Sequence, residues 1–452
     1  MIVRPVARLG ITVSLAIAFF PSVGQAADLS ADQWPQFRGP QATGVASSGR
    51  GLPDKWSDTE NVVWKADIDG RGWSSPVVWG DKVFLTTVVN SADTEPAKKG
   101  LYFGGNRPEP PESDHQWVVL CLDAESGKER WRNVVHEGKP TTSIHVKNSF
   151  ASETPVTDGK HLFVVFGGVG IFCFDLDGNE VWKRPLDAVK TRYGWGFAAS
   201  PVLDGDRLYF LNDNDDQSYL LALDKETGNE IWRVDRDEKS NWSTPFVWHH
   251  DGGTEIVVPA TGKIRSYDTN GKEVWSLKGM SSITIATPYV HDGLLIVSSG
   301  YVGDPSRPLY AIRPGASGDI TLAEGETSND SIAWSQPTGA PYNPTTIGYD
   351  GVVYVLHDRG MMAAFDAKTG EEVYSKTRIP KGRAFTSSPW AYDGKLFCLN
   401  EDGETFVIRA GDDFEVLHVN RLQDDDMGMA TPAIVGDRLY IRTAKRLYCI
   451  AN

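Results

Sequence analysis

The sequence predicts an all-β fold, an eight-bladed β-propeller, from a pattern that repeats along the chain. A Ser/Thr/Asn-Pro step is followed by a short hydrophobic run, a Gly/Asp turn and a second hydrophobic run. The steps end at Pro76, Pro155, Pro201, Pro245, Pro288, Pro344, Pro389 and Pro432, and most of them lie 43 to 46 residues apart. A period of roughly 40 to 50 residues with four short strands per repeat is typical of a propeller blade.

Each proline opens a predicted β-hairpin that supplies the first two strands of a blade. In the third repeat, Ser200-Pro201-Val-Leu leads into Asp204-Gly205-Asp206 and then into Arg-Leu-Tyr-Phe210. Glycine beside aspartate supplies the positive φ that such turns need. Related turns lie at Gly80-Asp81, Asp158-Gly159, Asp292-Gly293, Asp350-Gly351, Asp393-Gly394 and Gly436-Asp437.

A second hairpin follows the first and ends in an aromatic residue. Its clearest copy is Leu223-Asp224-Lys-Glu-Thr-Gly228-Asn-Glu-Ile-Trp232. The aspartate can accept bonds from nearby backbone N–H groups, and the glycine takes the left-handed position that closes the turn. We expect the indole to seal one blade against the next. The other copies end at Trp131, Trp182, Trp275, Trp334 after a longer connection, and Tyr374, and the copy around residues 409–416 is degenerate.

The two ends of the chain are predicted to meet in the last blade. That repeat stops one strand short at Tyr448-Cys-Ile-Ala-Asn452, whereas Asn61-Val-Val-Trp64-Lys65 has the pattern of a fourth strand without a blade. Pairing these strands would close the ring and remove its exposed edges. The predicted organisation is a signal peptide at residues 1–26, an N-terminal extension at 27–59 and one propeller domain at 60–452.

Residues 1–26 have the three parts of a secretory signal, which are Arg4 with Arg8, an apolar run from Leu9 to Phe20, and a small-residue end at Ala26. We therefore expect a periplasmic or secreted protein. The apolar run is shorter than the ~20 residues of a membrane-spanning helix, and no later stretch reaches that length. The residue directly after the expected cleavage site is not a cysteine, so lipidation is not predicted.

The charge of the chain and the spacing of its acidic residues argue against two kinds of ligand, nucleic acid and a bound metal ion. The net charge is −15, and it becomes −17 without Arg4 and Arg8, which argues against nucleic acid as a partner. Acidic clusters at residues 213–216 and 424–426 lack the spacing of a calcium loop, so they are interpreted as solvated loops and no metal site is predicted.

The four cysteines allow two disulfides, but Cys121, Cys173 and Cys449 occupy equivalent strand positions, which favours buried free thiols.

The candidate ligand site is the rim of the central channel, because common catalytic motifs are absent and loops carry binding in rigid scaffolds. Aromatic rings interleaved with basic groups suit a planar, acidic ligand. The alternative is that the aromatic side chains plug the channel and that the charges satisfy one another. The candidate residues are Trp73, Lys147, Asn148, Arg192, Trp195, Trp242, Asn343 and Arg383.

Two long connections, residues 88–117 and 313–333, interrupt the repeat. Most loops in compact domains are shorter than about 12 residues, so these segments are candidate lids or partner-contact elements. The alternative is disordered decoration.

The hairpins Leu223-Asp224-x-x-Thr227-Gly228-x-x-x-Trp232 and Phe365-Asp366-x-x-Thr369-Gly370 resemble the pyrroloquinoline-quinone (PQQ) repeat. That repeat is shared by quinoprotein alcohol dehydrogenases and by the outer-membrane assembly factor BamB. The segments Trp34-Pro-Gln-Phe-Arg-Gly-Pro40, Leu52-Pro-x-x-Trp56 and Val63-Trp64-Lys65 are also similar to those of secreted bacterial PQQ-like propellers. The chain lacks the adjacent cysteine pair of the dehydrogenases and the lipid-accepting cysteine of many assembly scaffolds.

The resemblance implies two classes of function, and the rim tryptophans suggest a third. The first is a non-catalytic binding or scaffolding propeller with an envelope protein partner or a small ligand at the channel rim, without a required cofactor. The alternative is a dehydrogenase of alcohols, sugars or polyvinyl alcohol that uses PQQ and calcium, for which Glu153 and Asp426 are the candidate bases. The second alternative is a propeller that captures carbohydrate on its rim tryptophans.

Overall fold

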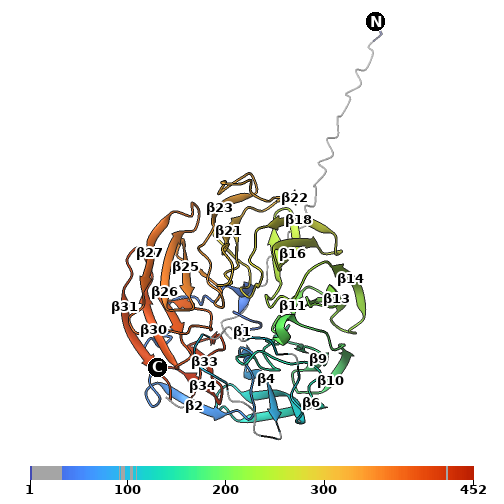
Figure 1. The fold of residues 1–452 in the computed structure, drawn as a ribbon, viewed down its shortest axis with the longest axis vertical. Helices are drawn as coiled ribbons and strands as arrows, with labels where there is room; N and C mark the ends of the chain where they lie inside the picture. Colours follow the sequence, from blue (N-terminus) through green and yellow to red (C-terminus); the bar gives the residue numbers. More distant parts are fainter. Residues whose placement is uncertain (3–32, 91, 93–96, 102–104, 108, 424–425) are drawn as a thin grey trace. The chain divides into compact units, whose positions relative to one another are not determined.

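Eight antiparallel sheets follow one another along the chain, and each forms one blade of a ring (Figure 1). The computed structural model describes residues 1–2, 33–90, 92, 97–101, 105–107, 109–423 and 426–452. Residues Ala31–Asn452 form one compact unit. The predicted eight-bladed propeller is therefore confirmed, whereas the expected signal peptide falls almost wholly outside the described residues.

The strands of the first four blades are listed from the channel outward. Blade 1 contains β3 (Val77–Trp79), β4 (Lys82–Asn90), β5 (His115–Asp123) and β6 (Glu129–Gly138). Blade 2 contains β7 (Val156–Thr157), β8 (His161–Phe166), β9 (Gly170–Asp175) and β10 (Glu180–Pro185). Blade 3 contains β11 (Val202–Asp204), β12 (Arg207–Asn212), β13 (Ser218–Asp224) and β14 (Glu230–Arg236). Blade 4 contains β15 (Phe246–His250), β16 (Gly253–Pro259), β17 (Lys263–Asp268) and β18 (Glu273–Lys278).

The other four blades continue the same order. Blade 5 contains β19 (Tyr289–His291), β20 (Leu294–Ser298), β21 (Leu309–Ile312) and β23 (Ile332–Gln336). Blade 6 contains β24 (Ile347–Tyr349), β25 (Val352–His357), β26 (Met361–Asp366) and β27 (Glu372–Arg378). Blade 7 contains β28 (Trp390–Tyr392), β29 (Lys395–Leu399), β30 (Glu404–Arg409) and β31 (Val416–Arg421). Blade 8 contains β32 (Ala433–Val435), β33 (Arg438–Arg442), β34 (Arg446–Ile450) and β2 (Val62–Asp67).

The ring is closed by strands from both ends of the chain. Strand β2 pairs antiparallel with β34, and Trp64 lies opposite Cys449. Figure 1 shows the blue β2 beside the red β34. The predicted closure is confirmed, and β2 covers the edge of β34 that would otherwise be exposed.

The first hairpin of each blade turns where the sequence places glycine beside aspartate. In blade 5, Asp292 has φ of 48° and Gly293 has φ of 78°. Two successive positive φ values match the twist of the strands that they connect. A similar pair of positive φ angles recurs at Asp350-Gly351 and Asp393-Gly394. These turns explain why glycine and aspartate stand side by side in repeat after repeat of the sequence.

The second hairpin joins neighbouring blades through its glycine and tryptophan. The Trp64 indole N–H donates to the carbonyl of Ala124 at 3.1 Å, which lies in the corresponding turn of blade 1. Gly127 of that turn has φ of 69°, and a Cβ there would lie 2.4 Å from the Trp64 ring. The same indole-to-carbonyl bond is made by Trp131, Trp182, Trp232 and Trp334. The predicted sealing role is confirmed at these positions.

Trp275 differs from the other blade tryptophans, because its indole donates to the Glu255 carboxylate of its own blade at 2.6 Å. The next blade lacks the aspartate turn that would accept this bond, since residues 313–333 replace it. Within that connection, β22 (Gly318–Asp319) pairs parallel with β18 and adds a fifth strand to blade 4. Ile320 is buried in the adjoining core. This connection therefore covers a sheet edge.

Hydroxyl side chains link the blades around the channel. At six of eight equivalent positions, the Ser or Thr next to the repeat proline donates its backbone N–H to the hydroxyl of the equivalent residue in the following blade. Such bonds run from Ser75 to Thr154, Thr154 to Ser200, Ser200 to Thr244, Thr287 to Thr345, Thr345 to Ser388 and Ser388 to Thr431, at 2.9 to 3.1 Å. We call these eight residues (Ser75, Thr154, Ser200, Thr244, Thr287, Thr345, Ser388 and Thr431) the hydroxyl belt, and all are buried.

The segment that precedes β2 packs into the ring. Strand β1 (Gln33–Trp34) pairs with the innermost strand of blade 1 and lies near the centre of Figure 1. A short 3-10 turn follows at Pro40–Ala42. Arg38 is fully buried and donates to the carbonyls of Ala42, Thr43, Thr346 and Pro389. Arg38 therefore ties the N-terminal segment to blades 6 and 7.

Candidate functional site

A cavity of about 550 Å³ lies in the channel above the hydroxyl belt, and all eight residues of the belt line it. We call it the channel cavity. It is built from the segments that enter the first strand of each blade and from the turns between the second and third strands. Six of the predicted rim residues line it: Trp73, Lys147, Asn148, Trp195, Trp242 and Asn343. Phe37 of the N-terminal segment lines it as well.

Aromatic rings form one wall of the channel cavity. The centroids of Trp195 and Trp242 are 5.9 Å apart, and His145 meets Trp195 edge-on at 4.8 Å. The indole N–H of Trp195 donates to Gly105, and that of Trp242 donates to Gly196. Because backbone carbonyls take these N–H groups, the indoles contribute apolar faces to the wall rather than hydrogen-bond donors.

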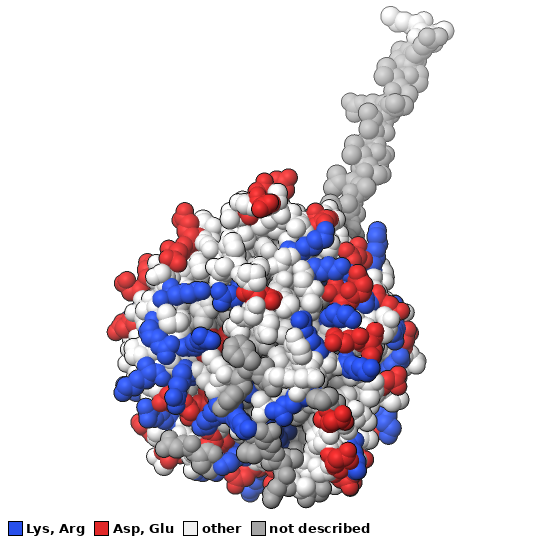
Figure 2. Space-filling model, viewed as in Figure 1, with Lys and Arg blue, Asp and Glu red and all other residues white. Residues whose placement is uncertain are grey.

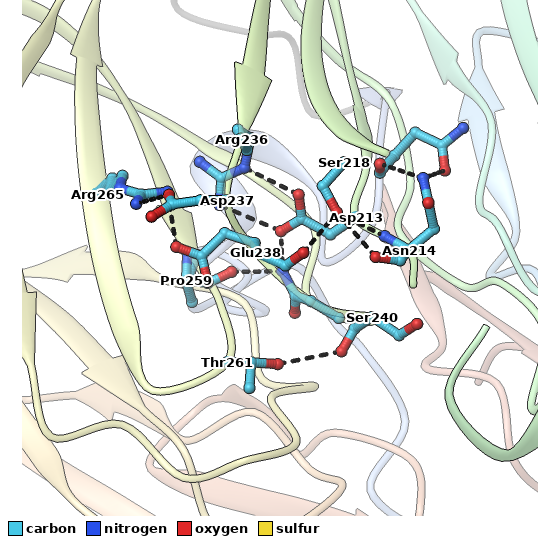
Figure 3. Close-up of polar contacts among 12 residues, drawn as sticks. Asp213, Asn214, Ser218, Arg236, Asp237, Glu238, Ser240, Pro259, Thr261 and Arg265 are labelled. Carbon is cyan, nitrogen blue, oxygen red and sulfur yellow. Dashed lines mark hydrogen bonds and ion pairs between the residues drawn. The ribbon is translucent and has the colours of Figure 1, made fainter. Parts of the chain in front are cut away.

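A buried polar network lies directly behind Trp242. Arg236 donates to both carboxylate oxygens of Asp213, at 2.8 and 3.1 Å, as Figure 3 shows. The Asn241 amide also donates to Asp213, at 3.3 Å. These bonds hold the segment that carries Trp242. The interpretation of Asp213 as part of a solvated loop is therefore wrong, because Asp213 is buried and paired with Arg236 at the end of β14.

The described part of the 88–117 connection reaches over the channel cavity. Leu101 lines the cavity, and Gly105 accepts the Trp195 indole bond. Gly100 donates its N–H to the buried Glu401 carboxylate at 2.7 Å and accepts a bond from Lys147 at 2.7 Å. These contacts place Gly100, Leu101 and Gly105 at the cavity, while residues 91, 93–96, 102–104 and 108 lie outside the described part of the connection.

The ionisable lining of the channel cavity is mainly basic. It contains Lys147, Arg307, Arg359 and Lys376, whereas Asp358 is the one acidic residue among the described lining residues. Lys and Arg side chains are also prominent on the left of this face, over β25, β26 and β30 (Figure 2). This sign is opposite to the net charge of the whole chain, which is −15.

The carboxylate of Asp358 is already used by the fold. Its oxygens accept the backbone N–H groups of Tyr342 and Asn343 at 2.8 and 2.9 Å, and the Asn343 amide donates to it at 2.7 Å. Burial raises the pKa of Asp358 above its usual value, although these hydrogen bonds oppose that rise. Asp358 therefore positions the segment around Asn343 in the cavity wall.

Two histidines in the lining are held neutral by their surroundings. Burial lowers the pKa of His145 to about 4, and the charges of Lys147, Arg107 and Arg71 act in the same direction. Burial also lowers the pKa of His357 to about 3, assisted by the charges of Lys376 and Arg307. In both cases nearby cations outweigh anions, which is the arrangement that favours an acidic ligand.

The remaining predicted site residues lie elsewhere. Arg192 donates to the carbonyl of Ser282 at 2.6 Å, and Arg383 forms an exposed ion pair with Asp402. Glu153 is buried and accepts the N–H of Gly167 at 3.0 Å. Asp426 is buried and accepts bonds from Thr443, Lys445 and Arg446. None of the four lines the channel cavity.

The basic residues on the blade 5 and blade 6 side of the cavity were missed by sequence reasoning. Arg307, His357 and Lys376 come from segments that do not enter a first strand and share no motif. Phe37 and Arg38 were noted only as part of a recurring N-terminal pattern. The segments that precede first strands are rich in aromatic and basic residues, but these side chains lie in other segments. Only the packing of the blades brings them to the cavity, so the sequence did not indicate them.

The four cysteines are buried free thiols, as expected. Burial raises the pKa of Cys121 to about 12 and that of Cys449 to about 11, so neither is a reactive thiolate at neutral pH. Within the described residues, His, Cys, Asp and Glu do not gather in groups of three or more that could hold a metal ion. No helix in the part of the chain described is long and apolar enough to span a membrane.

The repeated hairpins, the indole seals and the closed ring define a PQQ-repeat β-propeller. A family model described as outer membrane protein assembly factor BamB matches residues 115–301, 216–344 and 260–452. The chain belongs to this family, which confirms the resemblance seen in the sequence.

Two curated relatives show the range of proteins that share this sequence pattern. Polyvinylalcohol dehydrogenase of Sphingopyxis sp. (strain 113P3) is 24% identical over 347 residues, which cover 64% of this chain and 51% of the relative. BamB of Burkholderia pseudomallei (strain K96243) is 22% identical over 274 residues, which cover 56% of this chain and 66% of the relative. The chain thus spans less than two thirds of the length of each relative.

Solved structures share the fold at low sequence identity. BamB from Moraxella catarrhalis has a TM-score of 0.54 at 12% identity, covering 78% of this chain and 97% of its own. A europium-containing methanol dehydrogenase has a TM-score of 0.60 at 11% identity, covering 94% and 99%. Quinohemoprotein alcohol dehydrogenase from Comamonas testosteroni has a TM-score of 0.58 at 12% identity, covering 94% and 81%. These likenesses show the fold alone.

Proposed function

We propose that this chain is an exported, non-catalytic binding propeller whose channel cavity takes a small acidic ligand with a planar or apolar body. The observation that carries the proposal is the lining of the cavity, where Arg307, Arg359 and Lys376 and an indole wall surround one engaged carboxylate. The fourth cation of the lining, Lys147, is already paired with Glu401. Indole faces favour planar or apolar groups, and the cations favour acidic ones. The belt of hydroxyls adds polar groups at the base.

Dehydrogenation is the second candidate, and the relationship to a polyvinylalcohol dehydrogenase favours it. Such a reaction needs a carboxylate base within hydrogen-bond reach of the substrate hydroxyl. The carboxylates proposed for that role, Glu153 and Asp426, are buried outside the cavity lining and accept bonds from the protein itself. This arrangement supports binding over proton abstraction.

A calcium ion with PQQ does not fit the residues that line the cavity. Calcium takes six to eight oxygen ligands, with carboxylates among them. Asp358 is the one lining carboxylate in the described chain, and both of its oxygens already accept backbone N–H groups. The cations would suit the carboxylates of a quinone, but the oxygen donors for its metal partner are not gathered beside them. We therefore derive no catalytic step through this cofactor pair.

Export and partner binding are part of the same proposal. The N-terminal pattern of residues 1–26 supports export, and the BamB family supports a protein partner in the cell envelope. The outer strands β6, β10 and β14 carry exposed apolar residues at Val134, Val181 and Ile231. Because these exposed residues lie on the outer strands, away from the channel, they are candidate contacts for a protein partner.

The proposal is tested by indole fluorescence titration of the purified protein with three probes, which are PQQ, naphthalene-2,6-dicarboxylate and a neutral trisaccharide. We expect both acids to bind equally well in calcium and in EDTA. The Trp195→Phe variant should bind them more weakly, whereas the control Trp232→Phe, outside the cavity, should bind like the parent protein. Binding of the sugar without the acids would overturn the proposal in favour of carbohydrate capture, and binding that requires calcium would favour the quinoprotein class.

A further inference from the structure

Three basic side chains of blades 5 and 6 line the same part of the channel cavity. Arg307 precedes β21, His357 ends β25, and Lys376 lies in β27. They are close enough for their charges to interact. Lys376 and Arg307 both lower the pKa of His357, after the larger effect of burial. Burial and then the charge of Arg307 lower the pKa of Lys376.

These side chains have few partners within the protein. The Nε atom of Arg307 and the Nε2 atom of His357 are buried without a hydrogen-bond partner among the described residues. Lys376 Nζ donates to the carbonyl of Thr338 at 3.3 Å. No described carboxylate forms an ion pair with any of the three. Glu372 of the same strand raises the pKa of Lys376 as a smaller effect, but it lies beyond ion-pair distance.

Several buried cations elsewhere in this chain have anionic partners, whereas the buried Arg38 and Arg442 donate to carbonyl and hydroxyl groups. Arg236 pairs with Asp213, and Arg265 pairs with Asp237 and Glu238, as Figure 3 shows. Lys147 pairs with Glu401. Buried charges and buried N–H groups without partners are costly, so proteins usually supply a counter-ion from the chain or from a ligand. In the described structure, the counter-ion is missing at the place where the cations face a cavity.

We propose that Arg307, His357 and Lys376 form a subsite for an oxyanion, which is a phosphate, sulfate or carboxylate group of the channel ligand. This proposal rests on the proposed binding function and assigns the acidic end of the ligand to the blade 5 and blade 6 side. The Arg307 guanidinium would supply charge-assisted N–H donors, the neutral His357 ring one N–H, and Lys376 a mobile ammonium. The indole wall of Trp195 and Trp242 belongs to blades 3 and 4, so the two ends of the ligand would contact different blades.

The test is isothermal titration of the full-length protein with inorganic phosphate, sulfate and acetate, at constant ionic strength in sodium chloride. We expect at least one of these anions to bind. The Arg307→Gln variant should weaken that binding about tenfold or more, because it loses a charge-assisted donor. Arg383→Gln is the matched control, since Arg383 is exposed and lies outside the cavity lining. Its affinity should equal that of the parent protein.

The three anions also separate the sources of the ligand group. Binding of phosphate or sulfate without acetate supports a tetrahedral group, and binding of acetate alone supports a carboxylate. No binding of any anion, or equal affinity in the parent and Arg307→Gln proteins, would overturn the subsite. If Arg307→Gln does not fold, Lys376→Gln provides the same comparison, because Lys376 is exposed enough to be replaced without loss of core packing.

Failure of this subsite is distinguishable from failure of the binding function. If the aromatic acids bind through the indole wall while Arg307→Gln leaves all affinities unchanged, the subsite is wrong and the binding function stands. If the inorganic anion binds in an Arg307-dependent manner while the aromatic acids do not bind, the subsite stands and the proposed ligand class is wrong.

Discussion

Lys147 and Glu401 form a buried ion pair although 254 positions separate them in the sequence. Lys147 precedes blade 2, and Glu401 follows the second strand of blade 7. Glu401 also accepts the Thr386 hydroxyl at 2.6 Å and the Gly100 N–H at 2.7 Å. This group of contacts connects two sides of the channel with the loop that reaches over the cavity.

Breaking this pair from the lysine side is expected to destabilise the fold. Lys147→Met leaves the fully buried Glu401 carboxylate without its cation, which should lower the free energy of unfolding by roughly 3 to 5 kcal/mol. The double variant Lys147→Met/Glu401→Gln should be more stable than Lys147→Met, because no buried charge remains unpaired. Urea unfolding measures the free energy of unfolding of the single and the double variant. Arg383→Met, which breaks an exposed pair with Asp402, should change stability by less than about 1 kcal/mol, and an equal loss in both single variants would contradict the account.

The contact between Gly127 and Trp64 predicts how sensitive ring closure is to one methyl group. Gly127→Ala must place its Cβ against the Trp64 ring, 2.4 Å from the nearest atom, at φ of 69°. We expect a loss of about 3 kcal/mol or more from overpacking and left-handed strain together. Gly205→Ala is the control, because its φ is 57° and nothing lies within 4 Å of the new Cβ. It should cost about 1 to 2 kcal/mol in urea unfolding, and equal losses would show that Trp64 does not hold the blades together.

The hydroxyl belt predicts different effects for alanine and threonine at the same position. Ser200 accepts the N–H of Thr154 and donates its own N–H to Thr244, at 2.9 and 3.0 Å. Ser200→Ala leaves the buried Thr154 N–H without an acceptor and should cost about 1 to 3 kcal/mol. Ser200→Thr keeps the hydroxyl and should cost less. Thermal unfolding of the two variants makes the comparison, and indistinguishable melting temperatures would mean that the belt contributes no stability.

Glu153 predicts a specific pH dependence of stability. Burial raises its pKa to about 7 from the ordinary 4.5, so the folded protein binds this proton more tightly than the unfolded chain. The stability that comes from the protonated group is fully present below pH 4.5 and is lost as pH rises through about 7. Glu153→Gln keeps an acceptor for Gly167 and has no proton to lose. Relative to the parent protein, it should gain up to about 3 kcal/mol between these pH values, as measured by urea unfolding.

A constant difference between Glu153→Gln and the parent protein across that pH range would contradict the assignment. Burial likewise raises the pKa of Glu238 to about 7, but Glu238 is present in both proteins. Its contribution therefore cancels in the comparison.

The parts of the structure that were predictable are those written into every repeat. Asp224, Gly228 and Trp232 stand at fixed spacing, so their copies predicted the second hairpin, the seal between blades and the closure through Trp64. The Ser/Thr-Pro steps were visible in the same way, but their hydroxyl bonds were not, because those bonds join equivalent residues of different blades. A residue that recurs at the same place in every repeat therefore predicts a contact that recurs in every blade.

The channel site was only partly predictable, because its ionisable residues do not repeat. Trp73, Trp195 and Trp242 precede first strands, where the repeat itself indicates the channel. Arg307 and Lys376 come from a loop and an outer strand, and they reach the cavity through the packing of blades 5 and 6. Arg192 and Arg383 lie in segments rich in aromatic and basic residues, as expected of the rim. Their side chains nevertheless bind a backbone carbonyl and a surface carboxylate instead of facing the cavity.

Dye-linked turnover by the purified protein, supplied with PQQ and calcium, on alcohols, sugars and polyvinyl alcohol separates a binding propeller from a dehydrogenase. A binding propeller should give no dye reduction above that of PQQ and calcium without protein, because the described lining of the cavity has neither a free carboxylate base nor a set of oxygen ligands for calcium. Dye reduction that requires the protein and calcium, and that is lost in Glu153→Gln or Asp426→Asn, would contradict the account and establish a dehydrogenase.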